Sequence, residues 1–259
     1  MKQKPIIIAN WKMNKTNSEA LFFVEILKQV PKVLGKANVI LASSFTTLSD
    51  LNKALVHFNT EKQLLSLAAQ NMHFEKSGAF TGEVSCKMIK EVGCKYVLAG
   101  HSERRKFCNE SNALIQKKVK YALDNDVIPV LCIGESFEER KAKNSLKVIH
   151  TQLEECLAGL KASEVRQLII AYEPVWAIST GGTAEHAMPL QIQEIHAFIR
   201  AFILEKYGKK IAQEITIIFG GSVNEHNVQS YLSLPDVQGA LVGGASLDVD
   251  TFIRLLKNI

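Results

Sequence analysis

The chain has 259 residues, of which 47% are hydrophobic and 22% charged, and its 31 Lys and Arg against 26 Asp and Glu give a net charge of +5. The length is close to the roughly 250 residues of a single α/β barrel, so we expect one domain over residues 1–259. The positive charge is small and scattered along the chain, which argues against a nucleic-acid-binding surface.

Five cysteines, odd in number and without C-x-x-C spacing, predict reduced thiols rather than disulfides or a metal site. The N-terminal segment Met1–Pro5 runs directly into three isoleucines, a stretch too short for a signal sequence or a membrane span. We therefore expect no targeting segment, no membrane partner and a cytoplasmic location.

Short apolar or β-branched runs recur along the chain and predict strands. They are Ile6–Ala9, Val39–Ala42, Leu65–Ala69, Tyr96–Ala99, Ile128–Ile133, Leu168–Tyr172, Ile215–Phe219 and Ala240–Val242. Segments of helical periodicity lie between them, for example Ser18–Val30, Ser111–Leu123, Phe137–Leu157, Glu185–Tyr207 and Asp248–Lys257. The expected helix starts are Asn17 or Ser18, Ser111, and Ser136 followed by Glu139.

Strands that alternate with helices, and that are continuously apolar, predict a parallel sheet covered by helices. Eight such repeats favour closure into a (β/α)8 barrel of the α/β class. The competing open, doubly wound sheet would need a glycine-rich turn after the first strand. That turn is Asn10–Asn14 here, and it contains no glycine.

In a parallel barrel the carboxyl ends of all strands face one mouth, where the polar residues that follow them converge. These residues are Asn10 and Lys12 after the first strand, His101, Ser102 and Glu103 after the fourth, Glu173 after the sixth, Gly220, Gly221 and Ser222 after the seventh, and Gly243 and Gly244 after the eighth. A cation, an imidazole, a carboxylate and two Gly-Gly turns together predict an active site.

Glu173 lies between a buried strand and a glycine-ended loop, an apolar setting that makes a carboxylate a better proton acceptor. A helix beginning just beyond His101 would favour a neutral imidazole able to donate a hydrogen bond to a carbonyl. Lys12 follows a buried strand and needs an anionic partner, for which Glu103 and a substrate anion are candidates. The two Gly-Gly turns suit phosphate binding through backbone N–H groups. Taken singly, these features also fit an ion-paired glutamate, a core histidine, a surface lysine and tight turns.

A series of motifs, in this order, carries a resemblance to a known family. They are residues 10–14 (NWKMN), 69–71 (AQN), 78–83 (GAFTGE), 100–105 (GHSERR), 132–135 (CIGE), 171–178 (AYEPVWAI) and 241–247 (LVGGASL). Through them the chain resembles triosephosphate isomerase over essentially its full length. The resemblance implies interconversion of dihydroxyacetone phosphate and D-glyceraldehyde 3-phosphate through an enediolate, a step of glycolysis and gluconeogenesis that uses no cofactor and no metal.

The resemblance also implies residue roles. Glu173 would move the proton between carbons and His101 would move protons between oxygens, a division of labour for which this family is the standard example. Lys12 and Asn10, supported by Glu103, would stabilise the oxyanion. The phosphate would be held by Ser222, Gly243, Gly244 and the backbone of Ser179, with Ile178 and Leu241 as the apolar cover over the base.

A closing lid and a second subunit are implied as well. The lid would exclude water from the intermediate, and its other residues are Pro174, Val175, Trp176, Ala177, Thr180, Gly181, Gly182, Thr183 and Ala184. In a homodimer, the loop carrying Thr81 would insert near the partner's Lys12 and the partner's His101. The matching interface positions are Thr81, Gln70, Asn71, Glu83 and Arg104.

The chain departs from the family pattern in three lid-related positions. Phe219 stands where the family usually has tyrosine, Ser179 where it has glycine, and Gly182 where it has lysine. Since one net hydrogen bond is worth about 0.5–1.5 kcal/mol, loss of the tyrosine hydroxyl predicts a less populated closed lid.

Two other functions remain as alternatives. A barrel aldolase would form a Schiff base between Lys12 and dihydroxyacetone phosphate. A barrel that binds sugar phosphates without turnover would need no base. The joint presence of Asn10, Lys12, His101 and Glu173 favours the isomerase.

Overall fold

The computed structural model describes residues 4–56, 58, 64–178 and 187–259. These residues form a closed parallel barrel in which each strand pairs with the next and β8 pairs with β1. The strands are β1 Ile6–Asn10, β2 Asn38–Ser43, β3 Leu65–Ala69, β4 Cys94–Ala99, β5 Ile128–Ile133, β6 Ile169–Tyr172, β7 Thr216–Phe219 and β8 Gly239–Val242. The predicted strands and the predicted (β/α)8 barrel are confirmed, with small differences at the strand ends.

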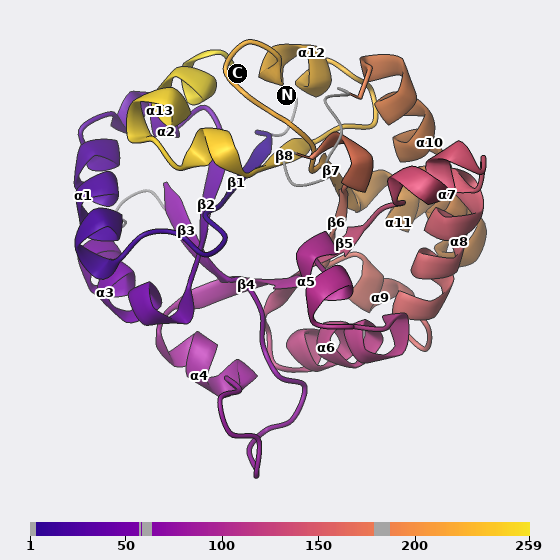
Figure 1. Cartoon of the computed structure of the whole chain (residues 1–259), viewed down its shortest axis with the longest axis horizontal. Coiled ribbons are helices and arrows are strands. Elements are labelled where there is room, and N and C mark those ends of the chain that lie inside the picture. The colour runs from indigo at the N-terminus through magenta and orange to yellow at the C-terminus, as the bar shows by residue number, and fades with distance from the viewer. Residues whose placement is uncertain (1–3, 57, 59–63, 179–186) are drawn as a thin grey trace.

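Helices surround the ring of strands (Figure 1). They are α1 Asn17–Lys28, α2 Pro31–Leu34, α3 Phe45–Val56, α4 Cys86–Glu91, α5 Ser102–Phe107, α6 Asn112–Asp124, α7 Phe137–Lys141, α8 Ser145–Cys156, α9 Ala162–Val165, α10 Pro189–Tyr207, α11 Lys209–Glu214, α12 Val228–Leu232 and α13 Val249–Lys257, with 3-10 turns η1 Val175–Ala177 and η2 Gly244–Ser246. Among the described residues, no helix is long and apolar enough to span a bilayer.

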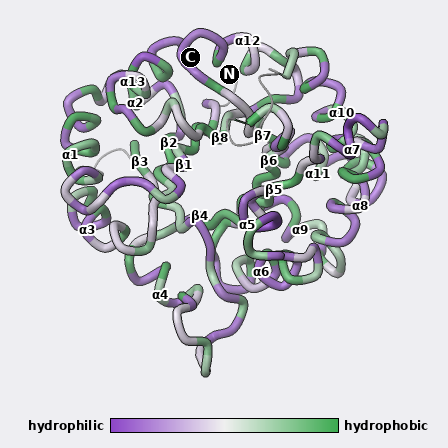
Figure 2. The backbone as a smooth tube through the Cα atoms, viewed as in Figure 1, coloured by the Kyte–Doolittle hydropathy of each residue, from purple (hydrophilic) through white to green (hydrophobic). Residues whose placement is uncertain are grey.

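The strands are buried on both faces, which explains their unbroken apolar sequences. Ile8 and Ile40 belong to the cluster that fills the barrel, whereas their neighbours Ile7 and Leu41 join the larger cluster between the barrel and the helices. Figure 2 shows hydrophobic stretches along the strand ring and on parts of the surrounding helices. Burial of both strand faces is what a parallel barrel requires.

Three predicted helix boundaries are corrected by the structure. The first helix is capped by Thr16 in a capping box with Glu19, not by Asn17 or Ser18, because the Thr16 hydroxyl reaches the Glu19 amide. The predicted helix Phe137–Leu157 is split into α7 and α8, because Lys143 has a left-handed φ of 58°. The helix predicted from Glu185 begins at Pro189, while residues 185–186 lie outside the described residues.

Two predicted helix starts are confirmed. Ser111 caps α6 through its hydroxyl, and Ser136 forms a capping box with Glu139 at α7. Several short helices, namely α2, α4, α9, α11 and α12, were not predicted, since four to six residues carry too little periodicity to detect. The 12-residue helix α3 was not named among the predicted segments either.

Candidate active site

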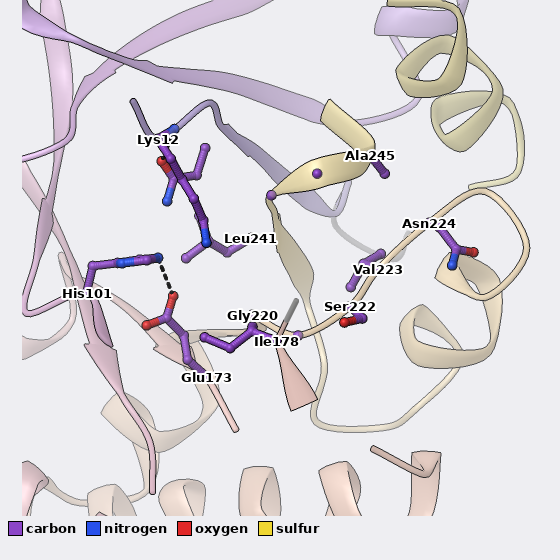
Figure 3. A pocket seen from close by; sticks show the side chains of 14 residues that line it. Lys12, His101, Glu173, Ile178, Gly220, Ser222, Val223, Asn224, Leu241 and Ala245 are labelled. Carbon is purple, nitrogen blue, oxygen red and sulfur yellow. Dashed lines mark hydrogen bonds and ion pairs between the residues drawn. The ribbon is translucent and has the colours of Figure 1, made fainter. Parts of the chain in front are cut away.

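A cavity of about 210 Å³ opens at the carboxyl ends of the strands (Figure 3). It is lined by residues at the ends of β1 and β8 and in the segments after β1, β4, β6, β7 and β8: Asn10, Lys12, His101, Glu173, Ile178, Gly220, Gly221, Ser222, Val223, Asn224, Leu241, Gly243, Gly244 and Ala245. The structure thus brings together most of the residues that the sequence placed at one mouth. Val223, Asn224 and Ala245 also line the cavity and were not predicted.

Glu173 lies at the centre of the strand ends, and its side chain is almost fully buried. Its Oε1 is 3.1 Å from His101 Nε2 (Figure 3). Its Oε2 accepts a hydrogen bond of 3.1 Å from the Ser102 amide. Both carboxylate oxygens therefore have donors in this conformation. The role of the Ser102 amide was not predicted, because it depends on how β4 and β6 are placed across the barrel.

Two glycines make room for Glu173. A Cβ atom at Gly134 would lie 1.7 Å from the Glu173 carbonyl oxygen, and one at Gly220 would lie 2.8 Å from the Glu173 Cγ. The backbone there is held by hydrogen bonds from Glu173 N to Ile133 O and from Gly220 N to Tyr172 O, each 2.7 Å. Gly134 is visible in the sequence just after β5, but the sequence does not show what approaches it.

His101 is the N-cap residue of α5, which confirms that a helix begins just beyond it. Its Nδ1 accepts a hydrogen bond of 3.3 Å from the Glu103 amide, so this nitrogen carries no proton and the proton is on Nε2. The 3.7 Å separation of Nδ1 from Glu103 Oε2 is therefore a proximity and not an ion pair. A neutral imidazole with a proton on Nε2 donates to Glu173 and faces the cavity.

Lys12 is held in place by its backbone and by its ammonium. Its φ is 54°, its amide donates to Asn10 Oδ1 at 3.1 Å, and its carbonyl accepts from Gln70 Nε2 at 2.9 Å. Its Nζ lies 2.7 Å from Glu103 Oε1. Of the candidate anions, Glu103 is the partner of Lys12 here, and Figure 3 shows the lysine side chain directed toward His101 and Glu173.

The opposite side of the cavity is formed by backbone. In η2, Ser246 donates from its amide and from its hydroxyl to the Gly243 carbonyl, and the Leu247 amide donates to Gly244 O at 3.1 Å. The first turn of such a helix leaves N–H groups free for an anion. Ser222 also lines this side, where its hydroxyl donates to Ala177 O at 2.7 Å.

The described part of the predicted lid is anchored by a buried carboxylate that the sequence did not single out. Glu135 accepts hydrogen bonds from Trp176 Nε1 at 2.9 Å and from the Tyr172 hydroxyl at 3.2 Å, and its carbonyl accepts from the Val175 amide. Burial raises the pKa of Glu135, while these donors oppose the shift. Pro174 to Ile178 lead into the lid from this anchor. The remaining lid positions, Ser179, Thr180, Gly181, Gly182, Thr183 and Ala184, lie outside the described residues.

A second cavity of about 300 Å³ adjoins the first. Asn10, Lys12 and His101 line both cavities, and Glu103 lines the second only. The predicted interface residues divide into two groups: Gln70, Asn71 and Arg104 line this second cavity, while Thr81 and Glu83 are exposed on the loop between β3 and α4. Figure 1 shows that loop projecting from the ring of helices.

Within the described ranges, no group of three or more His, Cys, Asp or Glu side chains is arranged to hold a metal ion. The cavity instead offers a carboxylate, a neutral imidazole and an ammonium at one end and backbone N–H groups at the other. Such a site suits proton transfer on a small substrate that carries an anionic group.

Comparison with known proteins identifies the family of the chain. The family model described as triosephosphate isomerase matches residues 5–259. The triosephosphate isomerase of Syntrophotalea carbinolica is 45% identical over 255 residues, covering 98% of each chain. Those of Protochlamydia amoebophila and Alkaliphilus oremlandii are each 45% identical over 256 residues, covering 98% of this chain and 94% and 99% of theirs. The chain therefore belongs to the triosephosphate isomerase family.

Proposed function

We propose that the chain interconverts dihydroxyacetone phosphate and D-glyceraldehyde 3-phosphate through an enediolate, as an enzyme of glycolysis and gluconeogenesis. The observation that carries the proposal is the buried Glu173 carboxylate beside the neutral His101 imidazole, with the Lys12 ammonium lining the same cavity. These are the groups that a proton transfer next to a carbonyl requires.

Glu173 is the base in this proposal. It takes the proton from the carbon next to the carbonyl and returns it to the neighbouring carbon, while His101 Nε2 donates to the substrate oxygen and passes protons between the two oxygens. Lys12 and Asn10 stabilise the negative charge that develops on the oxygen, and Glu103 holds the Lys12 ammonium in place. To reach the substrate carbon, the Glu173 carboxylate has to leave the Ser102 amide.

The phosphate would lie at the other end of the cavity. Ser222, Gly243 and Gly244, together with the backbone of Ser179, are its proposed ligands, and Ile178 and Leu241 its apolar surroundings. The start of η2 supports this placement, since free N–H groups at a helix start favour an anion. Residues 174–184 would then close over the bound substrate and exclude water from the intermediate.

We also propose a homodimer in the cytoplasm. The second cavity reaches Lys12 and His101, and the exposed side chains Met13, Phe45 and Phe107 line it, so a projecting loop from a second copy would cover apolar surface next to the catalytic residues. Thr81 at the exposed loop is the proposed inserting residue. The five free cysteines fit a reducing compartment.

The test of the catalytic proposal is a coupled isomerase assay on the purified protein and on Glu173→Asp. That substitution withdraws the carboxylate by about 1 Å and is expected to lower kcat on the order of 10²-fold. Glu91→Asp, the same change at an exposed glutamate of α4, is the matched control and is expected to keep full activity. Full activity in Glu173→Asp would remove the base assignment.

The aldolase alternative makes a separate prediction. A Schiff-base nucleophile must be an uncharged amine, whereas Lys12 is paired with Glu103 at 2.7 Å as an ammonium. Borohydride reduction in the presence of dihydroxyacetone phosphate is expected to leave the mass of the protein unchanged. A covalent adduct on Lys12 would support the aldolase instead, and phosphate binding without any turnover would support the non-catalytic alternative.

A further inference from the structure

Lys15 is a residue of the β1–α1 loop to which the mechanism above gives no role. It has a left-handed φ of 70°, a conformation that residues other than glycine adopt only rarely. Its side chain is half-buried, and burial lowers its pKa, opposed by the charges of Glu19 and Asp248. A lysine kept in an unusual backbone conformation and partly removed from water needs contacts that offset both costs.

These contacts join two loops that are far apart in the sequence. Lys15 Nζ donates a hydrogen bond of 2.7 Å to the Leu247 carbonyl, and the same ammonium lies 4.6 Å from the ring centroid of Phe23 and 5.3 Å from that of Trp11. The two rings pack edge to face with centroids 5.1 Å apart. A cation over two aromatic faces with a carbonyl acceptor is held at one position.

The Leu247 peptide is part of the turn that carries the proposed phosphate ligands. Its amide donates to Gly244 O at 3.1 Å, and its carbonyl accepts from Lys15, so both polar groups of this residue are fixed. On the other side, Trp11 precedes Lys12 in the chain. Lys15 therefore connects the loop that presents Lys12 to the turn that presents Gly243 and Gly244.

We infer that Lys15 is a positioning residue that sets the η2 turn at the correct distance from Lys12, so that one substrate can contact both. Lys15 itself does not line the substrate cavity. Loss of the Lys15 side chain is expected to weaken binding of the phosphate group more than it slows the proton transfer. The inference rests on the proposed function, because it assumes that η2 binds the substrate phosphate.

The test compares Lys15→Met with the wild-type protein and with Lys15→Arg. Methionine keeps an apolar chain over the rings but removes the charge and the donor, and it is expected to raise both KM and the inhibition constant of inorganic phosphate about tenfold, with kcat changed less than about threefold. Lys15→Arg keeps a charged donor and is expected to restore most of the phosphate affinity.

Lys143→Met is the matched control. Lys143 also has a left-handed φ, of 58°, but it is exposed in the turn between α7 and α8 and its ammonium has no partner among the described residues. It is expected to change neither KM nor the inhibition constant. If Lys15→Met proves insoluble, Lys15→Gln, which is neutral but keeps a donor, is expected to show a smaller rise in the same two constants.

Unchanged KM and phosphate inhibition in soluble Lys15→Met or Lys15→Gln would overturn the inference, even if thermal stability fell, because Lys15 would then only support the fold. A loss of kcat as large as the expected rise in KM, with no change in the inhibition constant of phosphate, would also overturn the inference. If the wild-type protein bound inorganic phosphate but did not isomerise the substrate, the proposed function would fail. Titration calorimetry with inorganic phosphate on the same variants would still decide the role of Lys15.

Discussion

The space around Glu173 exists because glycines, which have no side chain, follow the two strands that flank β6. Gly134 follows β5 and Gly220 follows β7, and a Cβ atom on either would overlap with Glu173. At Gly134 the overlap is with backbone, at 1.7 Å, so β6 itself would have to move. At Gly220 the overlap is with the side chain of Glu173, so the carboxylate can shift while the barrel stays intact.

Gly220→Ala should therefore impair catalysis more than folding. The new methyl carbon would lie 2.8 Å from the Glu173 Cγ, and displacement of the base by about 1 Å should lower kcat/KM on the order of 10²-fold. Gly35→Ala is the control, since a Cβ atom there lies no closer than 3.4 Å to its neighbours. Steady-state kinetics and thermal unfolding of both variants check this, and wild-type kinetics in Gly220→Ala would contradict it.

His196 should make stability depend on pH. It is fully buried, with Nδ1 3.1 Å from the Asp236 carbonyl and no partner for Nε2 in the part of the chain that the structure describes, and burial lowers its pKa to about 4. In the unfolded chain a histidine binds its proton near pH 6.5, so the unfolded state gains protons first as the pH falls. Stability is then lost between about pH 6.5 and pH 4, by about 3 kcal/mol in total.

The variant His196→Gln tests this dependence. It removes the titrating group, so the fall in the free energy of unfolding between about pH 7 and pH 4 should be smaller by about 3 kcal/mol than in the wild type. Urea unfolding at one fixed protein concentration measures it, because dissociation of an oligomer would otherwise change the result. Equal losses in the two proteins would show that other groups cause the acid sensitivity.

At the scale of elements, turn chemistry determines where helices stop. The segment from Phe137 to Cys156 has the pattern of one helix, but it is interrupted where Lys143 turns left-handed and the Asn144 amide bonds back to Glu139 O. The break separates α7, which begins with the Ser136 capping box, from α8. Helical periodicity does not reveal such a break, because α7 contains a single apolar residue, Phe137, and so has no apolar pattern of its own.

Lys143→Gly should stabilise the protein. Glycine adopts a positive φ without the steric cost of a side chain, and Lys143 is exposed, so the free energy of unfolding should rise by about 0.5–1 kcal/mol. Lys143→Ala keeps the steric cost and should change little. Denaturant unfolding of the two variants distinguishes them, and a loss of stability in Lys143→Gly would mean that the lysine side chain makes a stabilising contact.

At the scale of the whole molecule, the second cavity leaves the proposed catalytic residues open on one side. Asn10, Lys12 and His101 line it together with the exposed side chains of Met13 and Phe107. The exposed residues 75–83 of the loop that carries Thr81 line neither cavity. A second copy that inserts this loop would therefore connect assembly to activity.

Thr81→Arg should disrupt the assembly and lower activity. In the proposed homodimer, arginine would bring a charge next to the exposed apolar side chains that line the second cavity, so we expect a shift from dimer to monomer by light scattering and a fall in kcat on the order of 10²-fold, since the proposed catalytic loops would lose the support of the partner. Thr151→Arg, at an exposed threonine of α8, is the control and should remain dimeric and active. A monomeric wild-type protein, or a fully active monomeric variant, would contradict the proposal.

The amino-acid sequence by itself determined the class of the fold and predicted most of the residues that line the first cavity. The strands could be predicted because burial on both faces leaves continuous apolar runs, and Ser111 and Ser136 were recognisable as helix starts because capping is a local interaction. Asn10, Lys12, His101 and Glu173 were identifiable because each lies at the end of a strand or within two residues after it, and parallel strands end at one mouth.

Only the tertiary structure decided which partner each of these groups has. The two donors to Glu173, the attachment of Trp176 to Glu135 and the contact of Lys15 with Leu247 join residues that lie 41 to 232 positions apart in the chain. Periodicity and turn chemistry describe neighbours within a few residues. Contacts between distant loops depend on the closure of the barrel, which brings the ends of strands that are far apart in the chain within hydrogen-bond distance.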